Sequence, residues 1–297
     1  MSLHDFASHP VFGDLPVAEG VDTVAIDLPV GRLSAYRVVP DGPTVGTVLV
    51  VPGYTGSKED FRVTMPLLRD AGFEVIVVSR RGQADSVAPP SLDDHTLDEE
   101  ARDIVRIAPL LADGRPVHLL GHSLGGVIGR AAVLQAPELF SSYTMLCSGP
   151  HGWADRKYLE RHLVAEKGGA ALFDSTNPIT LGLDDAELAA LDPELAFVRT
   201  RMRRTSPHSL IGGARILELP EDTTEALAAT GVPVLVAHGE WDAAWPIPWQ
   251  RDMASRLGAR YEIVAGAWHS PQIEQPAATV ALLADFWGSV PGPTRAS

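Results

Sequence analysis

Along most of its 297 residues, the chain alternates short apolar runs rich in valine and isoleucine with longer segments of helical periodicity. This alternation is typical of a mostly parallel β-sheet that is covered by helices. The expected strands are residues 23–28, 33–39, 47–51, 73–78, 117–120, 143–147, 232–237 and 261–264. We therefore predict an α/β fold with a twisted sheet of about eight strands, the first two of them antiparallel and joined near Gly31.

The alternation stops in the middle of the chain, where helical segments follow one another without a strand. One surrounds residues 156–166, one is capped by Asp184, and one has Asp192 as its cap before Pro193. A helical insertion between two strands of a parallel sheet is typical of a cap over the strand ends. The predicted division is a core of residues 1–149 and 231–297 and a helical cap or lid of residues 150–230.

Acidic residues outnumber basic ones by 38 to 24, which gives a formal net charge of −14. A chain this acidic repels phosphate backbones and anionic membrane surfaces, which argues against nucleic acids as partners. The single cysteine, Cys147, excludes an intrachain disulfide. No apolar run reaches the length of a membrane span, about 18 residues, and no basic residue precedes Arg32 to form the charged part of a secretory signal. We expect a soluble, cytoplasmic protein without stable membrane insertion.

The segment Gly121-His122-Ser123-Leu124-Gly125 lies between the expected strand 117–120 and a helical pattern. A serine on a sharp strand-to-helix turn is held in a strained conformation with its hydroxyl exposed, and flanking glycines relieve the crowding. The helix that follows directs its N-terminal N–H groups at the oxygen that becomes negative during attack. Ser123 is therefore the candidate nucleophile.

With this motif in this place, the chain outside the cap resembles the α/β-hydrolase family, in particular its serine esterase and lysophospholipase-like branch. The segment 51–56 follows the third expected strand, where the family has its oxyanion loop, with Pro-Gly in place of the usual His-Gly. The resemblance implies that the backbone N–H groups of Tyr54 and Leu124 form the oxyanion hole. Residues 79–86 resemble the family's structural Asp-x-Arg-Gly-x-Gly-x-Ser turn, which makes Arg81 a scaffold residue.

The same resemblance orders the remaining catalytic residues along the chain as serine, then aspartate or glutamate, then histidine. Asp242 follows the expected strand 232–237, and His269 follows the last expected strand. Of the ten histidines, only His269 lies in a loop after the final strand, so we expect it to be the general base. We expect Asp242 to orient it, with Glu240 as the close alternative.

Tryptophans near the predicted site offer apolar surface for a substrate. Trp241 and Trp245 follow the strand 232–237, and Trp153 opens the cap. Packing of the cap on the sheet is the alternative explanation for such residues. We take these three as candidate substrate-binding residues and expect a small-molecule carboxylic ester with a hydrophobic moiety, for example a monoacylglycerol or a lysophospholipid.

A serine nucleophile disfavours the dehalogenase and epoxide-hydrolase branches of the family, which use an aspartate. Two alternatives stay open: a lactone, thioester or C–C bond hydrolase with the same triad, and a catalytically silent ligand-binding protein of the same fold. We expect no cofactor and no metal, because phosphate-binding glycine motifs are missing and Asp93-Asp94-His95 lacks partner spacing. The arginines within 199–204 are expected on the wet face of a cap helix, with contact to a substrate carboxylate as the alternative.

Overall fold

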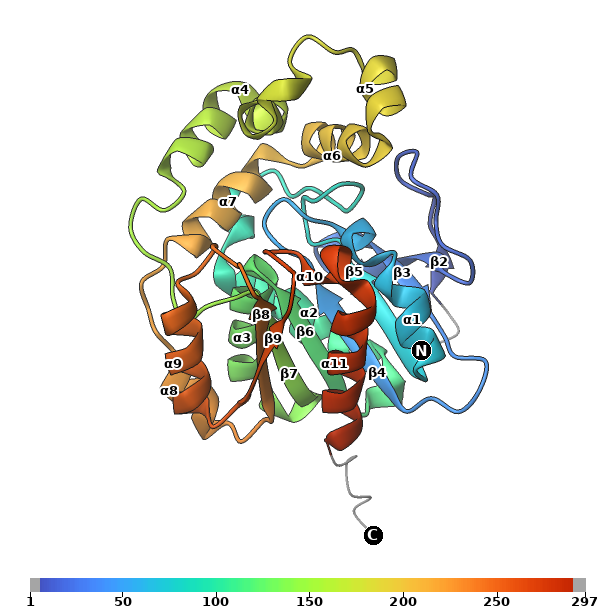
Figure 1. Ribbon diagram of the computed structural model, residues 1–297, viewed down its shortest axis with the longest axis vertical. Helices are drawn as coiled ribbons and strands as arrows, with labels where there is room; N and C mark the ends of the chain where they lie inside the picture. Colours follow the sequence, from blue (N-terminus) through green and yellow to red (C-terminus); the bar gives the residue numbers. More distant parts are fainter. Residues whose placement is uncertain (1–5, 291–297) are drawn as a thin grey trace.

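The computed structural model describes residues 6–290, and its centre is one nine-stranded sheet (Figure 1). The strands are β1 Ala7–Ser8, β2 Asp22–Leu28, β3 Gly31–Val38, β4 Gly46–Val51, β5 Phe73–Val78, β6 Val117–His122, β7 Phe140–Leu146, β8 Val234–Gly239 and β9 Arg260–Val264. Their spatial order is β1-β2-β3-β5-β4-β6-β7-β8-β9. The pairs from β5 to β9 are parallel, and the pairs from β1 to β5 are antiparallel. The predicted α/β fold with a mostly parallel sheet is confirmed, with nine strands in place of about eight.

Helices cover both faces of the sheet. The α-helices are α1 Thr64–Asp70, α2 Leu97–Ile107, α3 Leu124–Gln135, α4 Tyr158–Thr176, α5 Asp185–Leu191, α6 Pro193–Arg204, α7 Pro207–Leu217, α8 Thr224–Ala229, α9 Ile247–Leu257, α10 Pro271–Glu274 and α11 Pro276–Ser289. Buried residues of α2, α3, α8 and α9 join the core on one face, and those of α1 and α11 join the core on the other.

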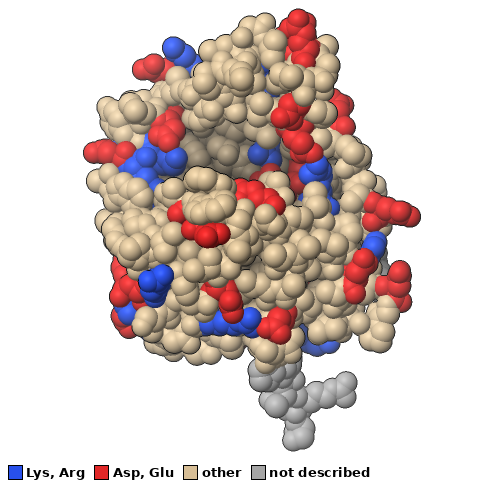
Figure 2. Space-filling view, in the orientation of Figure 1, with Lys and Arg blue, Asp and Glu red and all other residues tan. Residues whose placement is uncertain are grey.

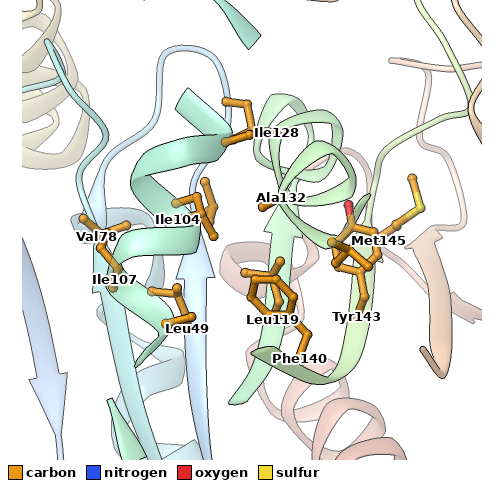
Figure 3. Packing of buried hydrophobic residues seen from close by; sticks show 14 of the residues in the cluster. Leu49, Val78, Ile104, Ile107, Leu119, Ile128, Ala132, Phe140, Tyr143 and Met145 are labelled. Carbon is orange, nitrogen blue, oxygen red and sulfur yellow. The ribbon is translucent and has the colours of Figure 1, made fainter. Parts of the chain in front are cut away.

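The core follows from the two-residue periodicity of strands that are buried on both faces. In β4, Leu49 belongs to the core beneath α2 and α3, and the next residue, Val50, belongs to the core beneath α1 and α11. Figure 3 shows Leu49 and Leu119 of the sheet in the same cluster as Ile104 of α2 and Ile128 of α3. This packing fixes the strand ends on which the site is built.

Three local details differ from the expectation. The strand β1 has two exposed residues and no alternating pattern, so the sequence gives no sign of it. The strand β8 begins at Val234 and not at residue 232, because Pro233 has no N–H to donate to a neighbouring strand. Ser57 before Lys58, Glu59 and Asp60 is a pattern that predicts a capped helix, but Ser57 precedes only a short 3-10 turn, Lys58–Phe61, and its hydroxyl donates to the carboxylate of Glu59.

Helices α4 to α8 lie between β7 and β8 in the chain, and α4, α5 and α6 rise above the strand ends (Figure 1). The side chains of Asp184 and Asp192 accept hydrogen bonds from main-chain N–H groups in the first turns of α5 and α6, at 2.8 and 3.0 Å. A separate apolar cluster joins α4, α5, α6 and α7, and consists of Val164, Leu172, Phe173, Leu188, Met202 and Leu210. In contrast, α8 packs against α9.

Within residues 6–290, no helix combines the length and the apolar character that crossing a membrane requires.

Candidate active site

Ser123 lies on the turn between β6 and α3, with φ 54° and ψ −119°. A positive φ is uncommon for a residue with a side chain, and such strain clusters at functional sites. The turn is tight: a Cβ on Gly121 would lie 2.3 Å from the oxygen of Gly125, and a Cβ on Gly125 would lie 2.0 Å from the oxygen of Val51. Only glycine fits at both positions. The turn therefore presents the Ser123 hydroxyl at the carboxyl end of β6.

The loop that follows β4 lies against this turn. A Cβ on Gly53 would be 3.2 Å from the Cβ of Ser123. The Nε2 amide of Gln83 donates to the carbonyl oxygens of Gly53 and Tyr54, at 3.0 and 3.1 Å, and so fixes two peptide groups of the loop. Tyr54 thus lies in a fixed loop beside the nucleophile, and Leu124 is the first residue of α3.

Three side chains from separate loops form one chain of hydrogen bonds. His269 follows β9, and its Nε2 lies 3.0 Å from Ser123 Oγ. Asp242 follows β8, and its Oδ1 lies 2.8 Å from His269 Nδ1. Because a carboxylate can only accept, Nδ1 carries the proton, which leaves the Nε2 lone pair to accept from the serine hydroxyl. This is the geometry that activates a serine for attack.

Asp242 is held as a carboxylate by its neighbours. Burial on its own raises the pKa of Asp242, but the hydrogen bond and charge of His269 and the donors Ala244 N–H and Gln250 amide outweigh it, so the pKa is lowered overall. The two donors lie 3.0 and 3.2 Å from the carboxylate oxygens. The alternative acid, Glu240, is exposed and accepts from the Gly266 N–H at 2.9 Å. The structure therefore brings Asp242, and not Glu240, to the histidine.

His122, the residue before the nucleophile, contacts the loop that carries His269. Its Nε2 donates to the main-chain carbonyl of His269 at 2.7 Å, and the two rings lie 5.1 Å apart. Burial, then the charge of His269, lowers the pKa of His122 to about 4, so it is neutral at pH 7. Sequence reasoning missed this contact because the turn direction is visible only in three dimensions.

The same two imidazoles and the Cys147 thiol have nitrogen and sulfur atoms within 4.8 Å of one another. Metal binding needs a thiolate, whereas burial and the nearby Asp242 charge raise the pKa of Cys147 well above its ordinary value. The two imidazole Nε2 atoms already take part in the hydrogen bonds described above. These three side chains therefore do not suit the binding of a metal ion.

A cavity of about 890 Å³ opens over the nucleophile, with Ser123 and His269 in its wall. In Figure 2 this face of the molecule is hollowed below α6 and above α10, and Lys and Arg side chains lie within the hollow and at its edge. The larger apolar residues of the lining are Leu15, Val63, Phe197, Val198, Leu217 and Ile273. The cavity therefore combines apolar walls with charged groups.

The three candidate tryptophans occupy different places. Trp153 lines the cavity. Trp245 is fully buried, its indole N–H donates to the carbonyl of His151 at 2.8 Å, and it is not part of the lining. Trp241 is half-exposed, packs on Trp268 with ring centres 5.5 Å apart, and also lies outside the lining. The structure thus places only Trp153 of the three at the cavity wall.

The arginines of α6 were expected on a wet face, and for two of them this is wrong. Arg199 and Arg201 are each only 5% exposed. Arg199 donates to main-chain carbonyls just before α5, and Arg201 pairs with Asp60 at 2.6 Å. Arg156 lines the cavity although no sequence pattern singled it out. Its one signal was its position three residues after Trp153, which alone predicts nothing.

The chain is similar to known proteins in sequence and in fold. A family model described as the alpha/beta hydrolase family matches residues 48–282. A Variovorax paradoxus (strain S110) protein, named provisionally as the carbamate hydrolase RutD, is 27% identical over 262 residues, or 85% of this chain and 96% of the relative. The solved enol-lactonase of Burkholderia xenovorans LB400 has a TM-score of 0.74 at 19% identity, covering 88% of this chain and 98% of its own. A thermophilic esterase from Thermogutta terrifontis has a TM-score of 0.72 at 22% identity, covering 90% and 98%.

Proposed function

The chain belongs to the alpha/beta hydrolase family, and from this membership we propose that it cleaves a carboxylic ester with a hydrophobic moiety through an acyl-enzyme on Ser123. One observation carries the proposal: the hydrogen-bonded series of Asp242, His269 and Ser123 ends on a strained serine in the wall of a large cavity. The apolar lining of that cavity supports the hydrophobic moiety.

In the proposed reaction, Ser123 Oγ attacks the ester carbonyl carbon while His269 Nε2 takes the hydroxyl proton. The resulting oxyanion accepts hydrogen bonds from the backbone N–H groups of Leu124 and Tyr54. His269 then gives the proton to the leaving alcohol, and the acyl group stays on the serine. Water, deprotonated by His269 Nε2, attacks the carbonyl carbon of the acyl-enzyme. The bond from that carbon to Ser123 Oγ then breaks, the acid is released, and His269 returns the proton to Ser123 Oγ. Asp242 stabilises the imidazolium in both half-reactions.

The experiment that tests this is fluorophosphonate labelling followed by intact-mass measurement. We expect the native protein to gain one phosphonyl group, and Ser123→Ala and heat-denatured protein to gain none, because only an activated serine reacts. A screen of 4-nitrophenyl esters from acetate to palmitate then measures turnover of the ester class. A well-folded protein that neither reacts with the probe nor cleaves these esters would contradict the proposal.

The competing reactions use the same three residues and are separated by substrate. If a lactone, a thioester or a substrate with a scissile C–C bond is turned over faster than every ester, then hydrolysis of that class becomes the assigned reaction. A catalytically silent ligand-binding protein predicts no labelling at all. The intact hydrogen-bond series and the strained serine support an enzyme over this alternative.

A further inference from the structure

Seven charged side chains line the cavity above Ser123: Glu59, Asp60, Arg62, Arg156, Lys157, Glu194 and Arg201. Six of the seven have a partner of opposite charge. These ion pairs are Arg62 with Glu194, Arg201 with Asp60, Lys157 with Glu160, and Glu59 with Lys58. Arg156 differs, because no carboxylate oxygen of residues 6–290 lies within 4.0 Å of its guanidinium.

Arg156 is nevertheless held firmly. Its guanidinium carbon lies 3.8 Å from the ring centre of Trp245 and 4.3 Å from that of Trp153, and Nη2 donates to the carbonyl of Ala244. Cation–π contacts of this kind stabilise a charge without neutralising it. The Nη1 atom is buried and has no acceptor among the described residues. Two aromatic rings and one carbonyl therefore fix a cation whose donors are not all used.

An unpaired cation in this position has an electrostatic consequence. Burial lowers the pKa of Arg156 to about 10, although Asp242 and Glu160 raise it, so the group stays charged at neutral pH. A partly buried charge without a partner is unfavourable unless a ligand supplies the opposite charge. Among the described residues, Arg156 is thus a cation of the cavity lining without an ion-pair partner, in the same lining as the nucleophile and the base.

We propose that Arg156 binds a carboxylate of the substrate, so that the natural substrate is an ester that also carries a carboxylate group. This inference rests on the proposed serine-hydrolase function and narrows its substrate class. A planar guanidinium matches the geometry of a carboxylate, and its single positive charge balances the single negative charge of the carboxylate. A phosphate dianion fits less well, because the only other cations of the lining already have carboxylate partners.

The test compares esters that differ only in the carboxylate. Mono-4-nitrophenyl adipate is matched with 4-nitrophenyl hexanoate, the corresponding succinate with the butyrate, and 4-acetoxybenzoate with 4-acetoxybenzamide for a carboxylate on the alcohol side. Spontaneous hydrolysis of each is subtracted. We expect a higher kcat/KM for the carboxylate member in at least one pair. In Arg156→Gln, the ratio of kcat/KM within that pair falls about 10- to 100-fold, as expected for one hydrogen-bonded charge pair.

Three further variants keep the result interpretable. Arg156→Lys keeps the charge without the planar fork and retains part of the preference. Arg62→Gln removes a cavity cation that already has a partner, so we expect a smaller change in the ratio. Arg203→Gln removes an exposed arginine paired with Asp185, outside the cavity lining, and leaves the ratio unchanged. A ratio that falls equally in all four variants would overturn the proposal.

Two readouts separate failure of this inference from failure of the proposed function. Fluorophosphonate labelling of Ser123 and turnover of neutral esters, without any carboxylate preference, leave the serine hydrolase intact and refute the role of Arg156. Binding is measured independently in Ser123→Ala by calorimetry, with monomethyl adipate and with monobutyl phosphate. We expect monomethyl adipate to bind, and we expect Arg156→Gln, added to Ser123→Ala, to weaken its affinity by the same 10- to 100-fold. Tighter binding of the phosphate would overturn the carboxylate assignment.

Discussion

The two walls of the cavity are built on different principles. On the sheet side, Ser123, Asp242 and His269 stand on short loops at strand ends and are fixed by hydrogen bonds and close backbone contacts. On the helical side, Arg156 lies between the rings of Trp153 and Trp245 and donates to the Ala244 carbonyl. Groups that react and groups that bind a substrate both need positioning within about 0.5 Å. The sheet side achieves this with hydrogen bonds and close glycine contacts at strand ends, and the helical side with aromatic rings around one long side chain.

The substitution with the largest expected effect on the sheet side of the cavity is Asp242→Asn. We expect kcat to fall on the order of 10⁴-fold, because an amide at this position favours the wrong tautomer of His269. Steady-state hydrolysis of a 4-nitrophenyl ester measures the change. Glu240→Gln is the matched control, since its carboxylate contacts the Gly266 N–H and not the imidazole, and it leaves kcat within a few-fold of wild type. The reverse pattern would make Glu240 the acid.

The next test removes the close approach at the nucleophile turn. In Gly125→Ala, the new Cβ would meet main-chain oxygens of Val51 and Pro52 at 2.0 and 2.7 Å, and neither can move without shifting the loop that follows β4. We expect the free energy of unfolding to fall by about 3 kcal/mol or more, measured by urea denaturation. Gly288→Ala in α11 is the control, because nothing lies within 4 Å of its new Cβ. A Gly125→Ala protein of full stability would show that the turn can relax.

A third test uses the two ends of β6, where His118 and His122 are both buried. Burial lowers the pKa of each to about 4, so between pH 6.5 and pH 4 the unfolded chain binds more protons than the folded chain. Stability is fully present above pH 6.5 and is lost as the pH falls through this window, by about 3 kcal/mol for each histidine. Replacing either residue by Asn should flatten the pH dependence of unfolding by that amount.

The two histidines also separate structure from catalysis. His118 bonds to the Ser142 hydroxyl at 2.8 Å and stacks on Trp287, far along the strand from the nucleophile turn. His122 supports the carbonyl of His269. We therefore expect a lower kcat in His122→Asn than in His118→Asn, measured at pH 7.5. An unchanged pH dependence in both variants would contradict the assignment of these groups.

The contrast between the walls also explains what the sequence could predict. The residues of the hydrogen-bonded series each follow a strand, and strand runs and the glycine-flanked serine are local patterns. The buried pairs of Arg199 and Arg201, and the place of Arg156 against Trp245, join residues that are far apart in the chain. Helical periodicity predicts that these helices exist, but not which neighbour each long side chain reaches. Their burial was missed for that reason.

The smallest effect tests whether the helical wall unfolds on its own, as the predicted cap of residues 150–230 implies. The Asp184 side chain caps α5 and accepts from the Glu187 N–H at 2.8 Å, and the Thr96 hydroxyl caps α2 in the same way at 3.4 Å. Replacing either capping residue by alanine lowers the free energy of unfolding of its unit by about 1 kcal/mol. If the walls are separate cooperative units, Asp184→Ala raises amide exchange only in α5 and α6, whereas Thr96→Ala lowers the stability of the whole sheet. Hydrogen exchange by mass spectrometry, with urea unfolding alongside, distinguishes local opening from global unfolding.

An equal loss of global stability in both variants would contradict this expectation. It would mean that the helices and the sheet unfold as one unit, and that substrate entry does not depend on independent opening of the helical side.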